Sequence, residues 1–152
     1  MLSNFEIIDY AKNKDYNLIG VYSKDRLPDE RRVGSYIINM QDNDEGNGTH
    51  WIAFIIFETG KSLYFDSYGV SAPANILEFL KIFKPNIATN KRQIQYIDSD
   101  MCGYFCLGFI KWFNNVNPKK EDVYELYDDF INAFSSNLKL NDKIVMEMLN
   151  KD

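Results

Sequence analysis

Residues 48–57 read GTHWIAFIIF, and they join a polar approach to an apolar run that is almost continuous. From His50 to Phe57 the apolar residues do not alternate with polar ones, which is typical of a strand buried on both faces. His50, the only histidine of the chain, begins this run directly after the polar loop 41–49. We therefore expect a central strand that carries a titratable side chain at the edge of the sheet.

The segments around this strand predict a small α+β domain with a central mixed sheet and helices around it. The turn ETGK (58–61) and the strand SLYFDS (62–67) form a hairpin with the central strand. Residues 20–34 hold turn formers and charges, and we expect a surface segment there. The other expected elements are strands at 35–40 and 92–97, helices at 3–13, 73–83 and 98–113, and two amphipathic helices after Lys120.

The composition predicts one domain, residues 1–152, with a real core, since 45% of the residues are hydrophobic and 15% aromatic. The net charge of −5 argues against a broad nucleic-acid surface, because Lys and Arg supply most of the affinity for phosphates. No apolar run is long enough to span a membrane, and the first residues do not resemble a signal peptide. We expect an intracellular, reducing location.

The two cysteines, Cys102 and Cys106, differ in what their positions indicate. Cys102 lies in the first turn of the helix expected at 98–113, after the capping residues Ser99 and Asp100, where the helix dipole favours a thiolate. Gly103 would leave one side of this turn open. Cys102 is therefore a candidate nucleophile, although a buried core cysteine is the plainer alternative. Cys106 is expected in the core.

A metal site is not expected, because two cysteines and one histidine do not complete a four-ligand zinc site.

Asp66 and Gln95 are the remaining candidates. The hairpin brings Asp66 to the sheet end that carries His50, where its carboxylate can accept a hydrogen bond from the imidazole. A turn-initiating aspartate is the alternative. Gln95 lies seven residues before Cys102, and its amide could stabilise an oxyanion together with the backbone N–H of Cys102. Gln93 is two residues earlier, and spacing alone does not separate the two glutamines.

The order of these residues resembles the adenain/Ulp1-like (clan CE) cysteine proteases. The similar stretches are GTHWIAF, LYFDSYG and QYIDSDMCGYFC, with NLIGVYSKDRLP upstream, and they span residues 17–113. The resemblance is strongest to adenovirus-type maturation proteases, including those of virophages and virus-like DNA transposons. It implies the circularly rearranged papain-like fold of that group, with the nucleophile on a buried helix.

The resemblance also implies a role for each residue. Cys102 would be the nucleophile, His50 the general base and then acid, and Asp66 the residue that orients His50. Gln95 would form the oxyanion hole, and Trp51 and Gly103 would shape the site. The substrate would be a viral capsid or core precursor, cut after a small residue such as glycine, in the virion, host cytoplasm or viral factory. No cofactor is implied.

The chain departs from the adenovirus pattern in being shorter and acidic and in lacking a third cysteine. These departures argue against DNA activation and against a disulfide-linked activating peptide, and whether another peptide activates the enzyme stays open. We also expect a monomer. Two alternatives keep the fold: a Ulp1-like protease that cuts after Gly-Gly in ubiquitin-like modifiers, and a non-catalytic scaffold. A related acetyltransferase branch would need an acetyl-CoA site, and the sequence has no phosphate-cradling glycine loop.

Overall fold

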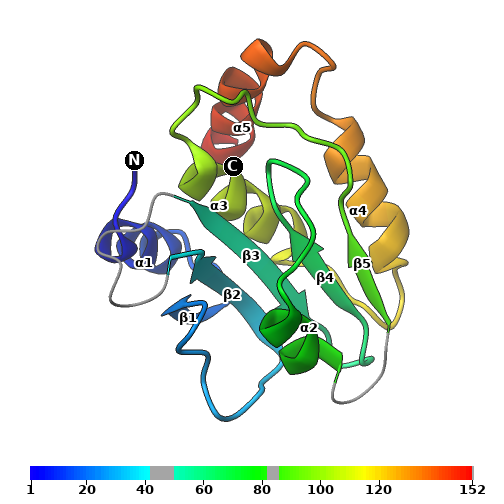
Figure 1. The fold of residues 1–152 in the computed structure, drawn as a ribbon. Coiled ribbons are helices and arrows are strands. Elements are labelled where there is room, and N and C mark those ends of the chain that lie inside the picture. Colours follow the sequence, from blue (N-terminus) through cyan, green and yellow to red (C-terminus); the bar gives the residue numbers. More distant parts are fainter. Residues whose placement is uncertain (42–49, 82–85, 152) are drawn as a thin grey trace.

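A five-stranded mixed sheet forms the centre of the computed structural model, which describes residues 1–41, 50–81 and 86–151 (Figure 1). The strand order follows the sequence. β1 pairs with β2 in parallel, β3 is antiparallel to both β2 and β4, and β4 pairs with β5 in parallel. The strands are β1 (Leu18–Ser23), β2 (Gly34–Asn39), β3 (Trp51–Ile56), β4 (Ser62–Phe65) and β5 (Ile87–Thr89).

β3 is the central strand, and all six of its residues are buried, as the apolar run predicts. Its side chains alternate between two cores. Ala53 and Ile55 pack into the larger core, and Ile52 and Phe54 into the smaller one. A strand covered on both faces leaves no room for polar residues, so its functional side chains are expected only where it ends.

Helices cover both faces of the sheet. Figure 1 shows α2 in front of the sheet, where it covers the smaller core, and α3 behind it. Nine of the twelve residues of α3 are buried, so the prediction of a central helix is confirmed. The helices are α1 (Asn4–Asn13), α2 (Ala74–Lys81), α3 (Cys102–Phe113), α4 (Val123–Asn132) and α5 (Asn141–Asn150), with a 3-10 turn, η1, at Leu138–Leu140.

The structure corrects the predicted strands at three places. Residues 18–23 form β1 where a surface segment was expected from residue 20. The apolar residues of this strand are interrupted by Gly20 and followed by a charged stretch from Lys24, which led to the surface prediction. β5 was missed because it is three residues long. Residues 92–97 are not a strand, because two successive amides, those of Ile94 and Gln95, both donate to the carbonyl of Ser67.

α3 begins at Cys102, four residues later than predicted. Ser99 does not cap it: its Oγ accepts a hydrogen bond from the amide of Met101, outside the helix. Residues 42–49 of the predicted loop 41–49 and residues 82–83 of the predicted helix 73–83 lie outside the described part of the chain. No helix in the described ranges has both the length and the apolar character needed to cross a membrane.

Candidate active site

The register of the β3–β4 hairpin brings His50 and Asp66 together. Ala53 pairs with Phe65, so the residue just before β3 and the residue just after β4 lie at the same end of the sheet. His50 Nε2 lies 2.9 Å from Asp66 Oδ1. Asp66 is only 2% exposed, and its Oδ1 also accepts a hydrogen bond from the amide of Tyr68 at 2.8 Å. The hydrogen bond from the Tyr68 amide therefore orients the Asp66 carboxylate independently of the imidazole.

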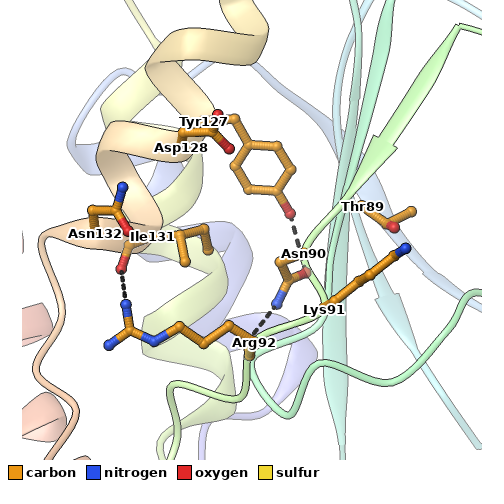
Figure 2. A pocket seen from close by; sticks show the side chains of 8 residues that line it. All are labelled: Thr89, Asn90, Lys91, Arg92, Tyr127, Asp128, Ile131 and Asn132. Carbon is orange, nitrogen blue, oxygen red and sulfur yellow. Dashed lines mark hydrogen bonds between the residues drawn. The ribbon is translucent and has the colours of Figure 1, made fainter.

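Asn90 fixes the backbone of Asp66. Its side chain accepts from the Asp66 amide at 3.0 Å and donates to the Asp66 carbonyl at 2.5 Å, which continues the pairing of β4 with β5 beyond the last strand residue. The hydroxyl of Tyr127 donates to the same Asn90 oxygen at 3.1 Å (Figure 2). Sequence reasoning missed Asn90, although a buried asparagine after a short apolar run is a recognisable signal.

The hollow drawn in Figure 2 lies beside Asn90 and Tyr127, between β5 and α4. Arg92 crosses it and donates to the carbonyls of Ile131 and Phe134, near the C-terminal end of α4. This arginine therefore joins the segment after β5 to α4. The hollow contains neither His50 nor Cys102, so it is separate from the candidate site.

Cys102 is the first residue of α3, and its thiol lies beside the imidazole of His50. Burial alone would lower the pKa of His50. The hydrogen bond to Asp66 and then the interaction with the Cys102 thiol outweigh burial and raise this pKa from 6.5 to about 9. His50 Nδ1 is buried and makes no hydrogen bond of ordinary geometry with the described residues. Loose alignment of this kind is common between a nucleophile and its base in unliganded sites.

The arrangement places one imidazole between a carboxylate and a thiol. Asp66 holds Nε2, which leaves Nδ1 as the nitrogen available to the thiol. An imidazole that stays protonated at neutral pH can stabilise a neighbouring thiolate and can later give its proton to a leaving group. The site therefore has the parts for nucleophilic catalysis by cysteine.

Gln95 is completely buried and its carboxamide is fully engaged. Ser67 Oγ donates to Oε1 at 2.5 Å, which fixes the orientation of the amide. Nε2 donates to the carbonyl of Ser99 at 2.9 Å and lies 3.3 Å from its hydroxyl. Gln93, the other glutamine considered, is exposed and donates to the backbone carbonyl of Gln95 at 2.9 Å. Gln95 is thus the buried member of the pair.

Trp51 and Gly103 both lie against the start of the chain. The indole Nε1 of Trp51 donates to the carbonyl of Leu2 at 3.0 Å. A Cβ on Gly103 would lie 3.2 Å from Leu2 Cδ1, so glycine allows this close approach. The expectation of an open side at Gly103 is therefore corrected, because Leu2 occupies that side.

Cys106 lies one turn further along α3 and is fully buried, as predicted for a core residue. Burial raises the pKa of its thiol well above the usual value. In the described ranges, no three His, Cys, Asp or Glu side chains gather in a way that could hold a metal ion.

Comparison with known proteins adds evidence on the fold. No family model matches the chain, and no curated protein matches it. Two crystal structures of the ASFV pS273R protease, one of them the Se-Met protein, match with a TM-score of 0.56 and 15–16% sequence identity. The match covers 98% of this chain and 66% of the protease chain. The central domain of Lpg1148 from Legionella pneumophila matches at a TM-score of 0.44 and 11% identity, over 86% of this chain and 84% of that one.

The chain therefore has a fold similar to that of the ASFV pS273R protease. The predicted fold class is thereby confirmed. The chain spans just under two thirds of the length of the pS273R protease. At this level of identity the similarity concerns the fold, and the narrower likeness to adenovirus-type or virophage enzymes stays a prediction.

Proposed function

We propose that this protein is a cysteine endopeptidase in which Cys102 is the nucleophile, His50 the general base and acid, and Asp66 the residue that orients His50. The observation that carries the proposal is the position of the His50 imidazole between the Asp66 carboxylate and the Cys102 thiol. The likeness of the fold to a viral cysteine protease supports it.

The reaction is acyl transfer. The sulfur of Cys102 attacks the scissile carbonyl carbon while the thiol proton resides on His50, and a C–S bond forms as the C=O electron pair moves to oxygen. Collapse of this intermediate breaks the C–N bond, and the imidazolium gives its proton to the departing amine. Water then attacks the thioester, His50 accepts its proton, and the C–S bond breaks to release the acid and the thiolate.

The developing oxyanion needs hydrogen-bond donors close to Cys102. The backbone N–H of Cys102 at the start of α3 is one, and we assign Gln95 Nε2 as the second. Nε2 donates to the Ser99 carbonyl in the free protein, so it has to exchange that bond for one to the oxyanion. The Gln95 amide would thus already lie at the site in the free protein and would donate to the oxyanion when the intermediate forms.

The substrate in this proposal is a viral capsid or core precursor, cleaved after a small residue such as glycine during virion maturation. Two observations support it: the fold neighbours are a viral protease, and the nucleophile is only 2% exposed. A nearly closed site is best reached by a chain that has little side-chain bulk at the scissile residue. The acidic charge of the chain supports an enzyme that DNA does not activate.

The test is cleavage of a proteome-derived peptide library, with the cut sites read by mass spectrometry. The wild type is compared with Cys102→Ala, and Cys106→Ala serves as the matched control one turn away on the same helix. Cuts that follow glycine, that vanish with Cys102→Ala and that persist with Cys106→Ala are the expected result. Cleavage that survives Cys102→Ala would overturn the proposal.

Ubiquitin-like fusion proteins provide a second substrate arm. Cleavage after their Gly-Gly, with no activity on the library, would favour the deconjugating alternative. The protein is also tested after addition of a cell lysate, which could supply an activating partner. If it cuts neither the library nor the fusions with or without the lysate, the non-catalytic scaffold is the correct interpretation.

A further inference from the structure

Tyr68 lies in the turn that follows Asp66, and the geometry of this turn is tightly specified. Gly69 has φ +73°, and a Cβ on it would lie 3.0 Å from the backbone of Lys91, Arg92 and Gln93. Its amide donates to the Asp66 carbonyl at 2.8 Å. Only glycine fits such a position without strain, so the turn has little freedom to move Tyr68.

Three contacts join Tyr68 to the candidate site. Its ring lies over the imidazole of His50, with centroids 4.9 Å apart and planes inclined by 35°. Its amide donates to Asp66 Oδ1 at 2.8 Å. Its hydroxyl donates to the carbonyl of Ser99 at 3.2 Å, in the segment that precedes α3.

These contacts restrain the rotation of the His50 imidazole, which the hydrogen bond to Asp66 alone does not restrain. One hydrogen bond at Nε2 sets the distance of the imidazole from Asp66, but it does not prevent the ring from swinging about that bond. An aromatic face packed on the imidazole removes this freedom and shields it from water. A protonated imidazole also gains from the electron-rich face of a tyrosine ring.

The hydroxyl of Tyr68 has an anchoring role. It shares the Ser99 carbonyl with Gln95 Nε2, so the turn after Asp66 and the oxyanion glutamine meet at one backbone oxygen. Burial first, and then the nearby Cys102 and Asp66, raise the pKa of Tyr68, so this hydroxyl stays a proton donor at neutral pH.

We propose that Tyr68 is a positioning residue of this site: its ring covers His50 and holds Nδ1 toward Cys102, while its hydroxyl anchors the ring to the segment before α3. This rests on the proposed function, because the residue acts through the His50–Cys102 pair. The order of the sequence motifs did not indicate a role for Tyr68 in the candidate active site.

The experiment measures the rate of iodoacetamide alkylation of Cys102 from pH 5 to 9 by mass spectrometry, which needs no substrate. Buried Cys106 in the same molecule reports loss of folding. The variants are His50→Ala, Tyr68→Ala and Tyr68→Phe. The matched control is Tyr124→Ala, since Tyr124 is also half-buried and its hydroxyl also donates to a backbone carbonyl, that of Asn86 at 2.8 Å.

We expect His50→Ala and Tyr68→Ala to slow alkylation at pH 6 by about tenfold or more, because the thiolate loses its positioned imidazolium. The rate profile of Tyr68→Ala should move toward higher pH. Tyr68→Phe keeps the ring and should stay within about threefold of the wild type, since only one hydrogen bond is lost. Tyr124→Ala should leave both rate and profile unchanged.

NMR reports the contact between the two rings directly, because His50 is the only histidine and its ring protons give one set of signals. The shift caused by the Tyr68 ring should disappear in Tyr68→Ala and persist in Tyr68→Phe. If Tyr68→Ala is unfolded, Tyr68→Leu replaces it in both measurements.

Two results overturn the inference. If His50→Ala slows alkylation and the Tyr68 variant keeps the wild-type rate and profile, Tyr68 has no positioning role while the proposed function stands. If His50→Ala changes nothing, the pair itself is absent, and both proposals fall together.

Discussion

The two sides of the candidate site are built in different ways. His50 and Asp66 stand at the end of the β3–β4 ladder, where the register of paired strands sets their separation. Gln95 and Ser99 lie in an irregular segment that side-chain hydrogen bonds hold in place. A ladder distributes its restraint over many bonds, whereas the segment depends on a few buried polar groups. We therefore expect changes at the hairpin end to disable chemistry and changes in the segment to affect stability as well.

The largest effect is expected from Asp66→Asn. The amide can keep the turn bond from Tyr68, but it no longer stabilises an imidazolium, so peptide cleavage should fall by about 10²- to 10⁴-fold. The measurement is kcat/KM on the best library peptide. Exposed Asp98→Asn is the control, and an equal loss there would show that charge in general, and not the site, is responsible.

Gln95→Leu tests the other side of the comparison. It removes the proposed second oxyanion donor, leaves Ser67 Oγ without its acceptor, and leaves the Ser99 carbonyl with the Tyr68 hydroxyl as its remaining side-chain donor. We expect a loss of about 10²-fold in kcat and of about 1–3 kcal/mol in the free energy of unfolding. Gln93→Leu, at an exposed position, should do neither. Stability lost with full activity retained would remove Gln95 from the mechanism.

The pKa of His50, about 9, predicts how stability depends on pH. Because the folded protein holds the proton more tightly than the unfolded chain, this contribution is complete below about pH 6.5 and is lost as pH rises through 9. Its size is on the order of 1–3 kcal/mol. Urea unfolding at pH 6 and pH 9 should show this decrease, and Asp66→Asn should reduce it. An NMR titration of the single histidine measures the pKa itself, and a value near 6.5 would contradict the ion pair.

Ser67→Ala should have the smallest effect. It removes one donor to Gln95 Oε1 and leaves the bonds from Nε2 to Ser99 in place. We expect about 1 kcal/mol of lost stability and a decrease of a few-fold in kcat. Denaturant unfolding and steady-state kinetics measure both. A loss as large as that of Gln95→Leu would mean that the orientation of the amide, and not its presence, is what matters.

Local patterns were sufficient for the elements that are long or clearly periodic. The apolar run of β3, the hairpin and the apolar helix α3 were predicted, and so was the meeting of His50 and Asp66. β1 and β5 were not, because Gly20 interrupts the apolar residues of β1 before a charged stretch and β5 is only three residues long. Residues 92–97 look like a strand, yet they bond across to Ser67, and no local pattern encodes that partner.

By itself, the sequence determined the chemistry available to this protein: one histidine, a cysteine at the start of an apolar helix, and an aspartate one hairpin away. Only the tertiary structure decided how these groups are held. Asn90, directly after β5, binds the backbone of Asp66, and the ring of Tyr68 contacts His50. Gln95 donates to the Ser99 carbonyl, and Leu2 packs against Gly103. The physical reason is the distance along the chain between interacting residues. Hydrophobic periodicity can be recognised in neighbouring residues, whereas the partners of buried polar groups come from distant segments that only the folded chain brings together.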